Sequence, residues 1–234
     1  MEYLNLFLAV LPGLIIIIYI YNKDKYDKEP KKYILLATLL GVISCFPAVL
    51  FTLQFEQVLT VKIPEQMNLL QLVYFSFVAV AFSEEIAKYT LLKVFLFPKK
   101  VFDEPMDGIV YAVCVGMGFA ILENILYVLE GGLQLALLRM FTAVPAHAVF
   151  GVFMGYYLGL AKIRKKQEQP FAQYYFMAVI SAVVLHGAYD FFLFSNNILG
   201  LSILSFLGLM MAVSMSKKLI KEHLMNSPFK NDAP

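Results

Sequence analysis

The stretch LLQLVYFSFVAVAFSEEIAKYTLLKVFLF, residues 69–97, decides the fold class. It is long and apolar enough to cross a bilayer, which takes about 20 mostly apolar residues in a helix. It also carries Glu84, Glu85 and Lys88 in its interior. Ionisable side chains are expensive at membrane depth and are functional candidates by default. The stretch therefore predicts a membrane-spanning helix that carries a functional polar group.

The composition extends this interpretation to the whole chain. Of its 234 residues, 60% are hydrophobic, whereas soluble domains have about 45–50%. The net charge is only +2 and no zinc-finger spacing occurs, so we expect no nucleic-acid partner. Cys45 and Cys114 both lie in apolar runs, which argues against a disulfide framework. The predicted class is an all-α polytopic protein embedded in the lipid bilayer.

Seven segments reach the length of a spanning helix: 4–21, 33–54, 69–97, 108–129, 142–161, 172–194 and 198–215. Their connections are short, so we expect one integral membrane domain over residues 1–234. The first segment is expected to stay as a span, because its lysines follow the apolar run, whereas a cleaved signal carries its positive charge first.

The basic residues predict how the chain is oriented. Loops 22–32, 98–107 and 162–170 and the tail after Ser216 carry most of the lysines and arginines, and seven spans place all four on one side. The opposite side receives only Lys62 and Arg139. Because positively charged loops stay in the cytoplasm, we expect the N-terminus outside and the C-terminus inside.

Ionisable residues recur on four consecutive predicted spans: Glu84, Glu85, Lys88, Glu123, His147, His186 and Asp190. Residues three or four apart share a helix face. Lys88 can therefore neutralise either glutamate of the pair, and Asp190 can accept a proton from His186 and fix its tautomer. With neutral histidines, four carboxylates and one lysine leave a formal charge of −3. Shared protons, a protonated histidine or a bound cation must relieve this charge in a low-dielectric interior, and each of these is also a catalytic device.

Two neighbouring features predict packing. Gly151, Gly155 and Gly159 follow His147 at intervals of four, a pattern that lets membrane helices approach closely. This ridge is expected to hold His147 against another helix instead of lipid. Asn124 is interpreted as a hydrogen-bonding contact between helices.

Four motifs occur in order: EEIAK at 84–88, FAILEN at 119–124, PAHAVFG at 145–151 and HGAYD at 186–190. In these the chain resembles the PrsW family of bacterial membrane proteases, over a motif-bearing core of residues 69–194. The resemblance implies a bacterial cell-membrane endopeptidase that makes the first cut in a membrane-anchored protein such as an anti-sigma factor. It also implies that Glu84 and Glu85 are a catalytic pair and that His186 is a catalytic histidine.

The wider group that this family resembles includes the CAAX-processing and bacteriocin-processing membrane proteases. Those proteins typically have an arginine after the glutamate pair and a histidine in the second motif. This chain has Lys88 and Glu123 in those places, which argues against prenylated substrates.

Three functions remain open at this level. The first is an intramembrane endopeptidase with a glutamate-activated water. The second is a proton-coupled transporter that uses the carboxylate and histidine set, although no pair of broken helices in corresponding halves supports it. The third is a non-enzymatic membrane partner.

For the endopeptidase, two chemistries stay open. His147, His186 and Glu123 could bind Zn²⁺ with one position free, with Asp190 orienting His186. A metal-free glutamate mechanism is the alternative, as the CAAX relatives suggest.

The depth of the polar residues predicts where a cut would fall. Glu123, His147, His186 and Asp190 lie about 6–12 Å below the outer ends of their spans. Glu84 lies about 22 Å from residue 69, so that long span is expected to tilt or project. We therefore expect a cavity that opens to the external side and cleavage near the outer membrane boundary.

Overall fold

The computed structural model describes residues 2–195 and 201–231, and these residues form helices and connecting turns without a strand. The helices are α1 (Glu2–Lys23), α2 (Lys31–Glu56), α3 (Leu69–Tyr74), α4 (Ser83–Phe95), α5 (Pro105–Phe141), α6 (Ala143–Lys166), α7 (Ala172–Phe194) and α8 (Leu201–Met225). A short 3₁₀ turn, Pro64–Gln66, precedes α3, and a π-helical segment, Phe75–Phe82, joins α3 to α4. The all-α prediction is confirmed.

Seven helical stretches in the described residues are long and apolar enough to cross a membrane, as predicted. The third is composite, because α3, the π-helical segment and α4 run on as one stretch, Leu69–Phe95. Large apolar side chains cover the outside of the bundle: Phe46, Leu50 and Met211 are each more than 60% exposed. Such a surface suits lipid, since soluble monomers rarely expose large apolar patches.

The last helix extends well beyond the predicted boundary at residue 215. It ends at Met225, and Ile220 and His223 on the added turns are buried. The Nε2 of His223 donates to the carbonyl oxygen of Tyr156, at 3.1 Å. The helix therefore continues past its apolar stretch because α6 gives those turns a packing surface. The predicted start of this span, residue 198, lies outside the described residues.

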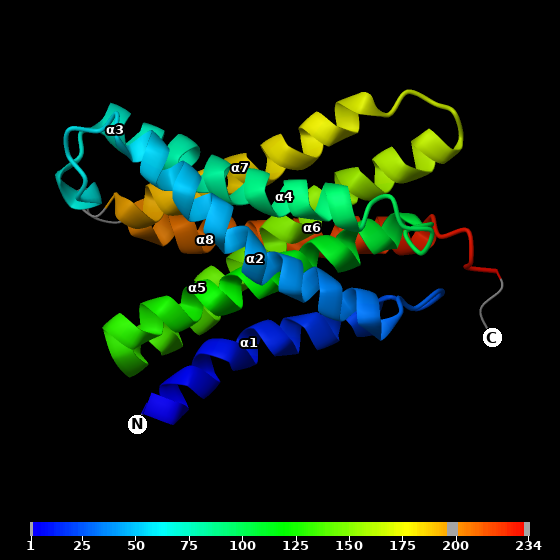
Figure 1. Ribbon diagram of the computed structural model, residues 1–234, viewed down its shortest axis with the longest axis horizontal. Helices are drawn as coiled ribbons and strands as arrows, with labels where there is room; N and C mark the ends of the chain where they lie inside the picture. The colour runs from blue at the N-terminus through cyan, green and yellow to red at the C-terminus, as the bar shows by residue number, and fades with distance from the viewer. Residues whose placement is uncertain (1, 196–200, 232–234) are drawn as a thin grey trace.

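Helix α5 is the centre of the bundle (Figure 1), and its first half is the most buried of the spanning stretches. Its closest neighbour is α6. A Cβ on Gly155 would overlap the backbone of Gly108 in α5, and one on Gly151 would come within 2.9 Å of the carbonyl oxygen of Ala112. The predicted glycine ridge is therefore confirmed as the surface on which α6 approaches α5 and carries His147 inward.

The second half of α5 departs from the predicted span and loop. Gly132 has φ 66° and ψ −157°, outside the helical region, and glycine adopts such values without a Cβ clash. The chain reverses there, since the side chain of Arg139 contacts Asn124, fifteen residues earlier. The segment 133–141 is therefore a short helix that folds back along the bundle, and the expected loop is confined to Gly132.

The two ends of the bundle differ in their chemistry. The connections 24–30, 96–104 and 167–171 and the C-terminal residues 226–231 lie together at one end, on the right in Figure 1, which we call the basic end. The opposite end, called the far end, holds the start of α1, the α2–α3 connection and Gly132. The loops that carry the lysines therefore do gather on one side.

Candidate active site

The glutamate pair lies where the third span changes from π-helix to α-helix. The π-helical segment ends at Phe82, and Glu84 and Glu85 stand in the first turn of α4. Helical segments of this kind are rare and frequently occur at functional sites. A π-helix rises less per residue than an α-helix, so Glu84 lies closer to the start of the span than an α-helical count suggests.

Lys88 links three of the predicted residues. Its Nζ donates to Glu84 Oε2 at 3.1 Å and to Glu85 Oε1 at 2.8 Å, and it lies 3.3 Å from His147 Nδ1. The ammonium also lies 3.8 Å from the centre of the Phe119 ring, a favourable position for a cation. Because an ammonium only donates, His147 Nδ1 must accept from it. The predicted placement of Lys88, within reach of either glutamate of the pair, is confirmed.

His186 lies between two carboxylates. Its Nδ1 is 2.9 Å from Glu85 Oε1, and its Nε2 is 3.3 Å from Asp190 Oδ2. Both ring nitrogens face acceptors, so either the ring carries both protons or one of the carboxyl groups is protonated. The imidazole stacks on Phe150, with 4.7 Å between ring centres. Its orientation is therefore fixed on three sides.

Glu123 and His147 form the other half of the polar centre. His147 Nε2 lies 2.9 Å from Glu123 Oε2, and since Nδ1 accepts from Lys88, Nε2 carries the proton. The two imidazoles are neighbours, with ring centres 5.3 Å apart. Glu84, Glu85, Lys88, Glu123, His147, His186 and Asp190 therefore form one connected set, on four helices.

Arg139 belongs to this set, and sequence reasoning missed it. Its Nη2 lies 2.9 Å from Glu123 Oε2, and its Nε donates to Asn124 Oδ1 at 2.9 Å. Asn124 in turn donates to the carbonyl oxygen of Ala9, so its predicted contact between helices is confirmed. Arg139 brings the formal charge from −3 to −2 with neutral histidines. The Gly131–Gly132 pair could have indicated this placement of Arg139 from the sequence, because adjacent glycines mark a chain reversal.

A cavity of about 310 Å³ reaches this polar set. The ionisable residues that line it are Glu84, Glu123, Tyr127, Arg139, His147, His186 and Asp190. The side chain of Glu84 is 12% exposed, whereas that of Glu85 is 1% exposed and does not line the cavity. The two adjacent glutamates thus differ, since only Glu84 can meet a molecule in the cavity.

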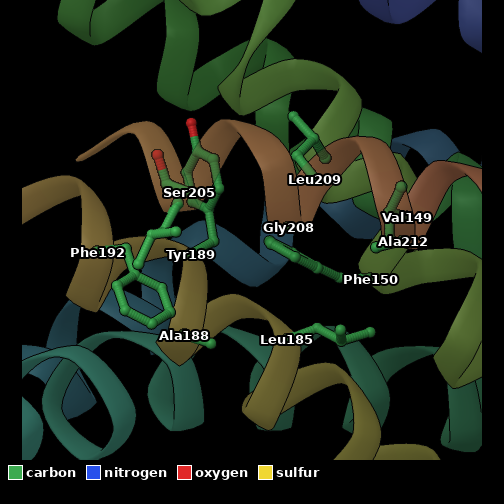
Figure 2. A pocket seen from close by; sticks show the side chains of 11 residues that line it. Val149, Phe150, Leu185, Ala188, Tyr189, Phe192, Ser205, Gly208, Leu209 and Ala212 are labelled. Carbon is green, nitrogen blue, oxygen red and sulfur yellow. The ribbon is translucent and has the colours of Figure 1, made fainter. Parts of the chain in front are cut away.

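A second, apolar chamber of about 90 Å³ adjoins the cavity. Figure 2 shows its walls, made by side chains of α6, α7 and α8 that point toward one another. Phe150, Tyr189, Ser205 and Leu209 line both spaces. The apolar chamber therefore shares a wall with the cavity of the polar centre.

The donors present fit a zinc ion in chemistry. Glu84, Glu85, His147 and His186 each offer one ligand atom within 4.8 Å of the others, and carboxylate and imidazole are zinc donors. Glu123, the predicted third ligand, is not in this group and instead contacts His147 and Arg139. The ammonium of Lys88 stands within 3.3 Å of three of the four, where it already supplies one positive charge.

A seven-span helical protein with two glutamates, two histidines and an accessible cavity at membrane depth has the features of an intramembrane hydrolase. The comparison with known families agrees. The sequence model described as PrsW family intramembrane metalloprotease matches residues 29–216. The chain belongs to this family, which selects the protease among the three functions considered and supports a multi-pass bacterial membrane protein.

Curated relatives cover most of the chain. Protease PrsW of Bacillus subtilis (strain 168) is 37% identical over 186 residues, 79% of this chain and 80% of the relative. Protease PrsW of Geobacillus kaustophilus (strain HTA426) is 35% identical over 191 residues, 81% of this chain and 79% of the relative. That of Clostridioides difficile (strain 630) is 34% identical, covering 81% and 79%. No solved structure matches the chain significantly.

Proposed function

We propose that this protease hydrolyses a peptide bond of a membrane-anchored protein, with Glu84 as the general base that activates water. The observation that carries the proposal is the difference between the two glutamates: Glu84 lines the cavity, while Glu85 is enclosed by Lys88 and His186. A base must lie within hydrogen-bond reach of the water that it deprotonates, and of the two adjacent glutamates only Glu84 reaches the cavity.

The chemistry follows from this placement. Glu84 takes a proton from water, and the water oxygen attacks the peptide carbonyl carbon. The same carboxyl group then gives the proton to the leaving nitrogen as the C–N bond breaks, as a general acid. Arg139, His147 and His186 line the same cavity, and the guanidinium of Arg139 places positive charge near the carbonyl oxygen, on which negative charge develops.

The remaining residues position these groups. Glu85 and Asp190 hold His186 from both ring nitrogens, and Glu123 and Lys88 do the same for His147. Lys88 also keeps Glu84 and Glu85 together against their repulsion. The arrangement lets two carboxylates stand side by side in a low-dielectric site, because each has a cation or a donor.

Zinc binding is the alternative chemistry, in which Glu84 serves as a ligand and not as the free base. Glu84, Glu85, His147 and His186 would hold the ion, and Glu123 would orient His147. A bound zinc ion supplies Lewis acidity and lowers the pKa of a water molecule that it coordinates. Stoichiometric zinc in the purified protein that is lost in His186→Ala supports this set. Cleavage that survives complete metal removal favours the metal-free glutamate mechanism.

The substrate and the position of the cut form the remaining part of the proposal. The polar centre lies on the far-end side of the bundle: Glu123 precedes the chain reversal at Gly132 by nine residues, and Asp190 is in the last two turns of α7. The basic residues of α6 and the loops lie at the other end. By the positive-inside rule the far end faces outward. This supports cleavage of a membrane-anchored substrate, such as an anti-sigma factor, near the outer boundary.

The direct test uses purified protein in liposomes with a single-span substrate. The wild type is expected to cleave it, while Glu84→Gln leaves it intact. Glu56→Gln, at the last and partly exposed residue of α2, is the matched control for the loss of one glutamate charge and should cleave normally. Full activity of Glu84→Gln would remove this residue from the chemistry.

A further inference from the structure

Three carboxyl groups meet at the basic end of the bundle, away from the polar centre. Asp24 directly follows α1, Glu104 directly precedes α5, and Asp107 lies in the first turn of α5. Each offers an oxygen within 4.8 Å of the others. Asp24 and Glu104 are 0% exposed, and Asp107 is 1% exposed. We call these three residues the acidic triad.

The triad contains carboxyl oxygens that no group satisfies. Both oxygens of Asp24, both of Glu104 and Oδ1 of Asp107 are buried and have no hydrogen-bond partner. Asp107 Oδ2 is the exception, because it accepts from the backbone N–H groups of Asp103 and Glu104 at 2.7 and 2.9 Å. Buried polar atoms normally have partners, and a buried unpaired charge is especially costly. Because one oxygen from each of the three residues lies within 4.8 Å of the others, these unpaired oxygens of the described residues can face a common ligand.

Among the described residues, no basic side chain forms an ion pair with the triad. Lys162 makes its hydrogen bonds to other groups, since its Nζ donates to the carbonyl oxygens of Phe97 and Lys99 at 2.7 and 3.2 Å.

A fourth buried carboxyl group adds to the negative charge nearby. Glu29 accepts a hydrogen bond from the hydroxyl of Tyr111. Burial, together with the charges of Glu104 and Glu29, raises the pKa of Asp24 to about 8. A buried negative charge at this site is therefore disfavoured unless a positive partner is present.

We propose that Asp24, Glu104 and Asp107 bind a divalent cation of the Mg²⁺ or Ca²⁺ class. An all-oxygen donor set selects these hard ions over zinc or copper. Oxygens on opposite sides of one ion stand about 4 Å apart for Mg²⁺ and about 5 Å apart for Ca²⁺, from bond lengths of about 2.1 and 2.4 Å. The triad oxygens lie within 4.8 Å of one another, which is compatible with binding to one such ion.

The cation would join segments that are distant in the sequence. Asp24 belongs to the α1–α2 connection, and Glu104 and Asp107 begin the central helix α5. One ion therefore ties the first helix pair to the centre of the bundle at the end opposite the polar centre. Its role is to stabilise the fold, and it takes no part in the hydrolysis.

The test is thermal unfolding of the full-length protein in detergent after treatment with a chelator and removal of the chelator. Adding Mg²⁺ or Ca²⁺ at constant ionic strength is expected to raise Tm in a saturable way, by about 5 °C, because the ion binds only the folded state. The two ions are titrated separately, so the tighter one identifies the preferred cation. No rise with either ion overturns the proposal.

Variants show whether the rise in Tm comes from the acidic triad or from the polar centre. Asp24→Asn and Glu104→Gln should each abolish the rise while the cation-free proteins stay at least as stable as the wild type, because repulsion within the triad is relieved. Asp27→Asn, an exposed carboxylate of the same connection, is the matched control and keeps the rise. His186→Ala should keep it too. A rise that persists in both Asp24→Asn and Glu104→Gln contradicts the assignment.

Equilibrium dialysis of the wild-type protein against radioactive Ca²⁺, with and without excess Mg²⁺, measures directly how many ions each chain binds. At least one ion is expected per chain, in addition to any in the polar centre. Binding that is absent from the wild-type protein, or that disappears in His186→Ala, overturns the proposal.

Discussion

The polar centre and the acidic triad are two clusters of buried carboxylates in one helical bundle, and they handle their charge differently. In the polar centre, Lys88, Arg139 and two imidazoles contact the carboxylates at 2.8–3.3 Å. In the triad, five oxygens are buried without a partner. The first cluster adjoins a cavity of about 310 Å³, whereas the second is fully enclosed. The comparison separates a site built to act on a substrate from one built to hold an ion.

The largest expected effect is the loss of activity in Glu84→Gln. A general base contributes about 10²–10⁴-fold to a rate, so kcat should fall by about that factor. Tm should change little, because Glu84 has access to the cavity and the amide can still accept from Lys88. The measurement is initial cleavage rate in detergent together with thermal unfolding. A Tm loss that accounts for the lost activity would give Glu84 a structural role instead.

Glu85→Ala sharpens the contrast within the pair. It leaves Lys88 and His186 buried without their shared acceptor, and breaking a buried ion pair costs about 3–5 kcal/mol. Unfolding by denaturant should therefore show a large loss of stability in Glu85→Ala and a smaller one in Glu84→Ala. Equal losses would break the distinction between a reacting glutamate and a positioning one.

Arg139→Ala should lower the cleavage rate by about 10–100-fold, as expected for a group that orients a residue of the active site. The loss acts through Glu123, which Arg139 contacts directly. Combining Arg139→Ala with Glu123→Gln should therefore give less than the product of the two single effects. Arg164→Ala, at the basic end of α6, is the control. If the effects of the two variants on the cleavage rate multiply fully, Arg139 does not act through Glu123.

Gly155→Ala is expected to reduce stability by about 1–3 kcal/mol, the usual range for overpacking. Its new methyl group would overlap the backbone of Gly108, which cannot move aside as a side chain can. Gly208→Ala is the matched control, because a Cβ there meets no atom within 4 Å. Denaturant unfolding of both proteins measures the difference. Equal stability of the two variants would contradict the close α5–α6 packing that places His147.

Filling the apolar chamber should have the smallest effect. Gly208→Leu projects a side chain into that chamber (Figure 2), and a change of this size in an apolar pocket alters kcat/KM by about tenfold. The expected result is lower kcat/KM at unchanged Tm, with Met211→Leu on the exposed face of α8 as the control. Unchanged kinetics would show that the substrate does not use the chamber.

Much of this arrangement could be predicted from the sequence because it rests on local spacing. The contacts of Lys88 with Glu84 and Glu85 and that of His186 with Asp190 follow from helical periodicity. Arg139 could not be placed this way, since its contact with Glu123 depends on a chain reversal at one glycine with positive φ. Hydropathy alone assigned that segment to a loop.

The acidic triad was missed for a different reason. Its residues lie in connections that read as ordinary polar loops, and burial there depends on how α1 and α5 pack. A signal was available, because Glu29–Pro30 and Glu104–Pro105 are two Glu–Pro pairs in loops predicted to share one side. Proline favours the first turn of a helix, so both pairs place an acidic residue at a helix start, at the same end of the bundle.

The central claim is that this polar centre cleaves a membrane-anchored protein from the far end of the bundle. The most direct measurement maps the new termini of a single-span substrate cleaved by the wild-type protein in liposomes of known orientation. Single cysteines at Gln134 and Gln167, both exposed, report the orientation to an impermeant thiol reagent, because Cys45 and Cys114 are buried. The account predicts one cut near the membrane boundary on the side of Gln134. A cut on the side of Gln167 would contradict it.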